Sequence, residues 1–279
     1  MVDEYVRQAP AAPLRRYLAW YTGYRQRDLP PAVHRGLPSP SLTLIFTLDE
    51  PLFIAAHPDR AQAPGSFGTL LGGLHTSPAL ITHQGVQSGI QIALRPVGAR
   101  ALLGLPAGEL TQLDLPADAV LGPAGARIYT RLREALTWPE RFAVLDQEFT
   151  RLAASKAASK APPSEVGYAW RLLLGSGGAV PVAELAARTG WSTRHLANRF
   201  REEIGLTPKA AARVIRFDRA RRVLAAAPPG NLADVAVACG YFDQAHLARE
   251  FRALAGCPPS RWLAEEFANV QAGAWLAGE

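Results

Sequence analysis

Side chains suited to recognising base pairs gather on two short segments of this chain. Arginine forms paired hydrogen bonds with guanine, and asparagine or glutamine forms them with adenine, in the major groove of duplex DNA. The residues that carry this chemistry are Arg194, His195 and Asn198 in the first segment and Gln244, His246 and Arg249 in the second. Their types and spacing predict two helices that each present a polar face to base edges.

Each segment is preceded by the elements that would position such a helix. The stretch from Glu184 to Phe200 recurs from Asp234 to Phe251, and the central glycines Gly190 and Gly240 are 240 − 190 = 50 residues apart. A repeat of this kind indicates a repeated architecture. Each copy opens with an acidic residue, which suits the first turn of a helix, and each glycine allows the left-handed turn that ends one. We therefore expect two helix-turn-helix motifs.

The second helix of each copy has a predictable start and a predictable buried face. Ser192 and Asp243 are preferred N-cap residues. A leucine and a phenylalanine lie four positions apart in each helix and share its inward face; they are Leu196 with Phe200 and Leu247 with Phe251. The second copy carries one extra residue between its glycine and its phenylalanine.

The segment between the copies predicts one long helix. Thr207 and Pro208 are typical of an N-cap and a first helical position. Residues 209–227 contain no helix breaker, and Pro228 follows them. A helix of about 20 residues is about 30 Å long. Successive major grooves lie roughly 34 Å apart along one side of a duplex. The connecting helix could therefore hold two reading helices about one DNA turn apart.

Basic residues accumulate in the same region. From Arg188 to Arg222 the chain has ten basic residues against three acidic ones. Contacts with phosphate groups require such an excess of positive charge. We predict that Thr193, Arg199, Arg201 and Arg216 contact phosphates. The alternative is that the arginines from 213 to 222 form only a solvated helix face.

These motifs resemble the AraC/XylS family of transcription regulators. The resemblance is carried by the segments Gly240–Phe251, Gly256–Trp262 and Gly205–Pro208, and it covers about residues 164–267. Cys257 and Leu247 stand where Thr or Ser and Phe are commoner. Ala197 stands at an outward position where family members often carry a longer side chain.

The resemblance implies a DNA-binding domain at residues 164–270 with double-stranded DNA as its partner. It places Ala197, Ala245 and Ala248 on the DNA-facing surface with the polar residues named above. It also implies a possible small-molecule effector, a possible homodimer and, for an activator, RNA polymerase as a further partner. The effector, the operator and the choice between activation and repression do not follow from it.

The first half of the chain has an α+β pattern. Residues 41–48, 52–56, 69–75 and 89–94 read as strands, and residues 96–103 read as a short helix that stops at Gly104. Residues 125–136 are amphipathic, with Ile128, Leu132, Ala135 and Leu136 on one face. Thr137 opens a further helix with a capping box. We expect a mainly β domain at residues 1–152, barrel-like or sandwich-like, with two helices that could pair with a second copy. Residues 153–163 read as a linker, and the all-α domain follows.

This half also resembles, more loosely, the sensor-like domains that precede the DNA-binding domain in actinobacterial family members. The segments that carry the resemblance are residues 37–44 and 89–106. Such domains bind an effector or form a dimer, so the resemblance implies one of these roles for residues 1–152. It does not identify residues that contact a ligand.

Composition excludes several other classes of protein. The net charge of +6 and the sequence pI near 9.7 are compatible with nucleic acid binding. The two cysteines, Cys239 and Cys257, indicate buried thiols rather than a disulfide framework. The sequence has no membrane-spanning stretch and no signal-peptide pattern, so we expect a soluble, cytoplasmic protein.

The sequence leaves two other functions open. One is a constitutive DNA-binding protein whose first half only dimerises; an apolar cavity there would favour a sensor instead. The other is a barrel enzyme, against which we find no phosphate loop, dinucleotide fingerprint or catalytic triad pattern. Four histidines in the first half lack the spacing of a metal site, so we expect no metal and no cofactor; they are His34, His57, His75 and His83.

Overall fold

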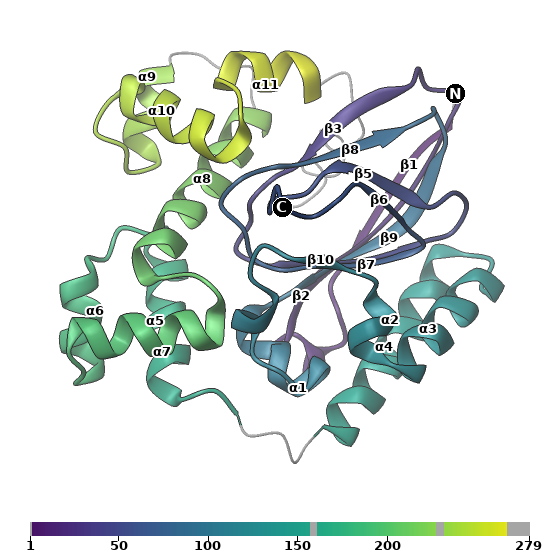
Figure 1. The fold of residues 1–279 in the computed structure, drawn as a ribbon, viewed down its shortest axis with the longest axis horizontal. Coiled ribbons are helices and arrows are strands. Elements are labelled where there is room, and N and C mark those ends of the chain that lie inside the picture. Colours follow the sequence, from purple (N-terminus) through teal and green to yellow (C-terminus); the bar gives the residue numbers. More distant parts are fainter. Residues whose placement is uncertain (1, 157–160, 227–231, 267–279) are drawn as a thin grey trace.

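The computed structural model describes residues 2–156, 161–226 and 232–266 and contains a β-rich N-terminal domain and a helical C-terminal domain (Figure 1). The N-terminal strands form two antiparallel sheets. The larger sheet has the order β1-β2-β9-β4-β7-β10 and the smaller one the order β3-β8-β5-β6. The strands are β1 (Val2–Gln8), β2 (Leu18–Arg27), β3 (Ala32–Gly36), β4 (Leu42–Thr47), β5 (Leu52–Ala56), β6 (Gly65–Phe67), β7 (Thr69–Gly72), β8 (Ala79–His83), β9 (Gln87–Leu94) and β10 (Asp114–Leu115).

The α+β prediction is confirmed, and the barrel alternative is wrong. The described strands form two separate hydrogen-bonded sheets and do not close into a ring. Strand β4 shows how the large sheet is covered on both faces. Leu44 and Phe46 belong to the main core, whereas the intervening Ile45 packs with Ile54 and Leu70 between the sheets. Alternate side chains of a strand point to opposite faces, so one strand serves both cores.

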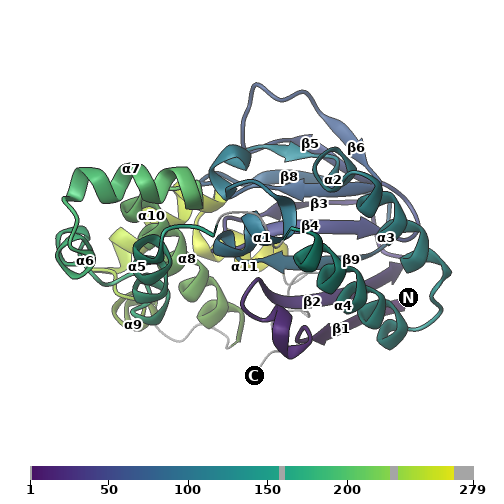
Figure 2. The same cartoon turned by 90° about the horizontal axis from the view of Figure 1, so that it is seen from below.

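Helices cover the outer face of the large sheet (Figure 2). Phe142 of α4 stacks on Tyr21 of β2 with 5.9 Å between ring centroids. The predicted capping box at Thr137 is confirmed, since its side chain accepts a hydrogen bond from the Glu140 amide. The helical elements of this domain are η1 (Ala12–Leu14), η2 (Pro96–Gly98), α1 (Ala99–Leu103), η3 (Ala107–Leu110), α2 (Ala117–Leu121), α3 (Pro123–Glu134) and α4 (Trp138–Ser155).

The predicted apolar face of residues 125–136 is only half correct. Ile128 and Leu132 are fully buried, but α3 ends at Glu134, and Leu136 is 82% exposed. The apolar faces of α3 and α4 therefore pack against the large sheet. Pairing with a second copy through these helices would have to use their charged outer faces. Helix α4 also extends to Ser155, three residues into the predicted linker, of which residues 157–160 lie outside the described chain.

The described part of the C-terminal domain contains seven helices. The longest, α8, connects the two copies of the repeat, with α6 and α7 at one end and α9 and α10 at the other (Figure 1). Residues 267–270, at the end of the predicted domain, lie outside the described chain. The helices are α5 (Ser164–Gly175), α6 (Val182–Thr189), α7 (Thr193–Ile204), α8 (Pro208–Ala226), α9 (Leu232–Ala238), α10 (Gln244–Ala255) and α11 (Pro259–Glu266).

The two domains meet at the C-terminal end of α7. The Arg100 guanidinium of α1 donates to both carboxylate oxygens of Glu203, at 2.7 and 3.0 Å. The Glu203 side chain is 3% exposed. The Thr111 hydroxyl donates to the carbonyl of Gly205 at 3.0 Å. A Cβ at Gly108 would lie 2.1 Å from the Glu202 carbonyl oxygen, so only glycine allows this approach. We call the contact of Arg100, Gly108 and Thr111 with α7 the interdomain clamp.

The clamp can be tested by removing one partner of its ion pair. Arg100→Ala should lower the free energy of unfolding by about 3 kcal/mol, because it leaves a buried carboxylate without its cation. Arg188→Ala breaks the exposed ion pair with Glu184 within α6. It should lower the free energy of unfolding by less than about 1 kcal/mol. Urea denaturation measures both variants. Equal, small losses would show that the buried pair does not hold the domains together.

Candidate nucleic-acid interface and neighbouring cavity

The first copy of the repeat folds as a helix-turn-helix. Gly190 ends α6 with φ of 71°, a left-handed conformation that favours glycine. The Trp191 amide then donates to the Ala186 carbonyl at 3.1 Å, which closes the turn. The Ser192 side chain caps α7 by accepting from the His195 amide. The predicted turn, cap and inward residues are thus confirmed.

The second copy repeats this geometry. Gly240 has φ of 79°, and the Tyr241 amide donates to the Ala236 carbonyl at 2.9 Å. The Asp243 carboxylate caps α10 by accepting from the His246 amide at 2.6 Å. The inward residues of both copies are fully buried, as predicted; they are Leu196, Phe200, Leu247 and Phe251.

Helix α8 fixes the two copies relative to each other. It has 19 residues, which corresponds to a length of about 28 Å. The predicted N-cap is confirmed, since the Thr207 hydroxyl accepts from the Ala210 amide at 3.2 Å. Phe217 of α8 meets Phe251 of α10 edge to face, with 4.9 Å between ring centroids. The middle of α8 is therefore packed against the reading helix of the second motif.

Most of the predicted DNA-contacting residues lie on the surface of α7 and α10. Within the described residues, no hydrogen bond or ion pair engages the side chains of Arg194, Asn198, Arg201, Gln244 or Arg249. These five side chains are available to a ligand. The exposed predicted residues are Thr193, Arg194, His195, Asn198, Arg201, Gln244, Ala245 and Arg249, and the partly buried ones are Ala197, Arg199, Arg216, His246 and Ala248.

The two histidines of the reading helices are partly engaged by the turns. His195 lies edge-on to Trp191, with 4.6 Å between ring centroids. His246 lies edge-on to Tyr241 at 5.3 Å, and its Nδ1 accepts a hydrogen bond from the Phe242 amide at 3.3 Å. One edge of each imidazole ring therefore contacts the protein, and only the rest of the ring can contact a ligand.

The predicted phosphate-binding cluster from 213 to 222 is largely engaged within the protein. Arg213 pairs with Glu250 at 2.8 Å, and Arg221 pairs with Asp218 at 2.5 Å. Arg222 pairs with the same Asp218 carboxylate. Charged side chains of a long helix pair with acids on the same and neighbouring helices, which counting charges along the sequence cannot reveal.

Two predicted phosphate contacts also have partners inside the protein. The Arg199 guanidinium lies 2.6 Å from Glu202. The Arg216 guanidinium lies over the Tyr241 ring at 5.9 Å. Arg201 remains unengaged. Arg252 is its equivalent in the second copy, because each follows the buried phenylalanine, and it is exposed as well. Alignment of the two copies indicates Arg252 as a further candidate phosphate contact, and our prediction did not include it.

A cavity of about 120 Å³ lies in the N-terminal domain between the two sheets. Its walls combine apolar side chains such as Leu52 and Ile81 with the charged side chains of Arg7 and Asp114. One wall residue, Arg221, comes from α8 of the helical domain. The cavity therefore adjoins the helix that joins the two motifs.

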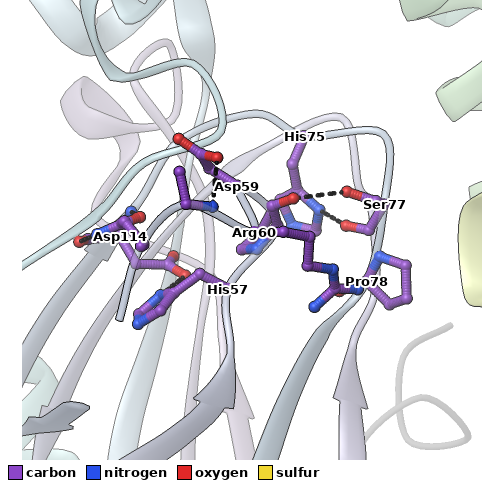
Figure 3. Close-up of polar contacts among 10 residues, drawn as sticks. His57, Asp59, Arg60, His75, Ser77, Pro78 and Asp114 are labelled. Carbon is purple, nitrogen blue, oxygen red and sulfur yellow. Dashed lines mark hydrogen bonds and ion pairs between the residues drawn. The ribbon is translucent and has the colours of Figure 1, made fainter. Parts of the chain in front are cut away.

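Two histidines, His34 and His75, line this cavity. His57 and His75 lie in the loops that follow β5 and β7, and Asp114 is the first residue of β10 beside them (Figure 3). His57 Nδ1 lies 2.7 Å from the Asp114 carboxylate, and His75 Nδ1 lies 2.6 Å from the Ser77 carbonyl. His57, His34 and His83 are buried.

His34 is a buried titratable residue in the wall of the cavity. It lines the wall, and its buried Nδ1 has no hydrogen-bond partner among the described residues. Burial, with a smaller contribution from His83, lowers the pKa of His34 to about 4. The imidazole is therefore neutral at pH 7 and can exchange a hydrogen bond with a ligand. Sequence reasoning treated it only as a scattered histidine.

The models of two families match parts of the chain. The model of a family described as "Helix-turn-helix domain" matches residues 185–265. A second family, described as "Domain of unknown function (DUF6597)", matches residues 6–116. No curated protein matches the sequence.

Among solved structures, the chain is similar to ToxT from Vibrio cholerae. One ToxT structure has a TM-score of 0.53 and 10% identity, with 88% of this chain and 97% of that chain covered. A structure of unsaturated fatty acid bound wild-type ToxT has a TM-score of 0.51 and 9% identity over 92% of this chain and 97% of that one. A third has (E)-4-(8-methylnaphthalen-1-yl)but-3-enoic acid bound, with a TM-score of 0.51 and 12% identity over 88% and 98%.

These matches agree with the two-domain fold derived above. At such identities the likeness establishes the arrangement of elements and not a shared ligand. None of the helices in the described part of the chain is both long and apolar enough to cross a membrane.

The pKa of His34 predicts a pH dependence of stability. Between its ordinary value of 6.5 and about 4, the unfolded state binds a proton that the folded state does not. The free energy of unfolding should therefore fall as the pH is lowered through this window, by at most about 1.4 kcal/mol per pH unit from this group. His34→Gln should flatten the slope in urea titrations at pH 7, 6, 5 and 4. Parallel curves for the two proteins would contradict the assignment.

Proposed function

Because the chain carries a helix-turn-helix domain of the AraC type, we propose that it is a sequence-specific DNA-binding transcription regulator. Helices α7 and α10 would enter two successive major grooves on one side of a duplex. One observation carries the proposal, namely that matched, exposed polar faces lie at the two ends of a single packed helix of 19 residues. The length of this helix approaches the roughly 34 Å between such grooves.

The side chains divide into two roles. We assign base recognition to those on the outer faces of the reading helices, with the alanines leaving room for close approach or contacting thymine methyl groups. The base-contacting set is Arg194, His195, Ala197, Asn198, Gln244, Ala245, His246, Ala248 and Arg249. We assign phosphate contacts to Thr193, Arg199, Arg201 and Arg216, which position a protein without reading sequence. Arg199 would have to exchange Glu202 for a phosphate.

The cavity supports modulation by a small molecule. The solved relatives named above bind an unsaturated fatty acid and a naphthyl butenoic acid, both of which are carboxylic acids with apolar bodies. Here an apolar wall is combined with Arg7 and Arg221. We propose that an apolar carboxylate occupies this cavity. It would compete with Asp218 for Arg221 and so affect α8, which carries both motifs.

A sensor accounts for the cavity better than a domain that only dimerises, because a filled core would suffice for the latter. A catalytic role has less support. The His57–Asp114 pair resembles part of a catalytic dyad, but His57 is 1% exposed and does not line the cavity. RNA polymerase and a second copy of the chain stay partners proposed from the family resemblance alone.

Base recognition by Arg249 and phosphate contact by Arg201 predict different effects of removing each side chain. Once an operator has been selected from random duplex DNA, Arg249→Ala should cost about 1–3 kcal/mol and relax specificity at one base pair. Arg201→Ala should weaken binding to all sequences alike and reduce the slope of log K against log salt by about 0.9. Fluorescence anisotropy at several salt concentrations separates the two. A uniform loss for Arg249→Ala would remove it from the base-reading set.

The ligand proposal is tested with straight-chain carboxylates from hexanoate to oleate, using the alcohols of equal length as controls. A carboxylate that fits should bind in isothermal titration and change operator affinity, whereas its alcohol should do neither. Arg7→Gln should weaken the carboxylate without changing operator binding by the free protein. Equal binding of acid and alcohol would show that the arginines do not select an anion.

A further inference from the structure

The turns before the two reading helices differ by one inserted residue, and that residue is Phe242. Eleven residues separate Gly240 from Phe251 (251 − 240 = 11), whereas ten separate Gly190 from Phe200 (200 − 190 = 10). In the first copy Trp191 is followed directly by the N-cap Ser192. In the second, Phe242 stands between Tyr241 and the N-cap. Its side chain is 88% exposed, more than any other large apolar side chain among the described residues.

Phe242 has no structural role that would explain a phenyl ring. An apolar residue just before an N-cap commonly packs on the fourth helical residue, here Leu247, and so fixes the entry of the chain into the helix. The exposure of Phe242 excludes that contact. Tyr241, which is 4% exposed, fills the core at this turn. The backbone of Phe242 donates to His246 Nδ1, which any residue except proline could do.

The position of Phe242 points to the reading surface. The N-terminal residues of a reading helix are those that contact base edges in helix-turn-helix proteins. Phe242 lies two residues before the first residue of α10 and is followed by the exposed Gln244. An aromatic ring among hydrogen-bonding side chains there is suited to contact an apolar group. In the major groove that group is the 5-methyl of thymine, which is absent from the other three bases.

We propose that Phe242 contacts a thymine methyl group at the edge of the site read by α10. The contact adds a preference for thymine to the second motif that the first motif lacks. This inference rests on the proposed DNA-binding function. It assigns a specificity-determining role to a residue that no polar pattern in the sequence indicates.

The experiment removes the methyl group from the DNA and the ring from the protein. In the selected operator, each thymine is replaced in turn by deoxyuridine, which lacks only that methyl. The wild-type chain should lose about fourfold in affinity at one thymine of the α10 half-site, the factor expected for one buried methyl group. Phe242→Ala should bind the thymine operator about as weakly as wild type binds that uracil operator, and should not distinguish the two.

Val237→Ala is the matched control, because Val237 is an exposed apolar residue of the same motif, 69% exposed, on the first helix. It should keep the full difference between thymine and uracil. The inference is overturned if Phe242→Ala prefers the thymine operator over the uracil operator by the same factor as wild type. It is also overturned if wild type shows no such preference at any thymine. Loss of transcription activation by Phe242→Ala with unaltered DNA affinity would assign the ring to polymerase and equally overturn it. Failure of wild type to bind any duplex would instead overturn the proposed function, and this inference with it.

Discussion

Packing of both motifs against one continuous helix is the constraint on which the remaining structure depends. Helix α8 buries Val214, Phe217 and Leu224 along its length, and Phe217 meets Phe251 in the core of the second motif. Each reading helix is then held by its own leucine and phenylalanine. Because these contacts are apolar and close-packed, the distance and rotation between α7 and α10 are properties of the fold. With a flexible connection, each binding event would instead cost the entropy of ordering the two helices relative to each other.

The N-terminal domain touches this assembly at several places, including the ion pair of Arg35 in β3 with Glu265 in α11, and two of the others differ in chemistry. The interdomain clamp joins the last turn of α7 to α1 and η3 through a buried ion pair and through backbone that only glycine lets approach. The second contact is Arg221, which leaves α8 to line the cavity between the sheets. One contact holds a reading helix, and the other connects the helix between them to the cavity. A change in the cavity therefore has a short physical route to the reading surface.

The same charges that suggested nucleic acid binding also stabilise the fold. Asp218 neutralises Arg221 and Arg222, and Glu250 neutralises Arg213. The arginines left unengaged among the described residues of the reading helices include Arg194, Arg201 and Arg249, all at outward positions. The set of unengaged arginines is consequently smaller than the excess of basic residues implied. The contact that we propose for Phe242 would add an apolar element that charge counting could not detect.

The sequence by itself determined the local structure of the repeat, because glycine turns, N-caps and leucine–phenylalanine spacing act between neighbours in the chain. It likewise predicted the two-part architecture, the capping box at Thr137 and most strands with strong alternation. Only the tertiary structure decided that the sheets stay open, that Arg213 pairs with Glu250 of α10, and that His34 and Arg221 line one cavity. These depend on contacts between residues far apart in the chain, such as Arg100 with Glu203, whose partners no local pattern specifies. Burial and pairing are collective outcomes of packing, and the spacing of residue types does not contain them.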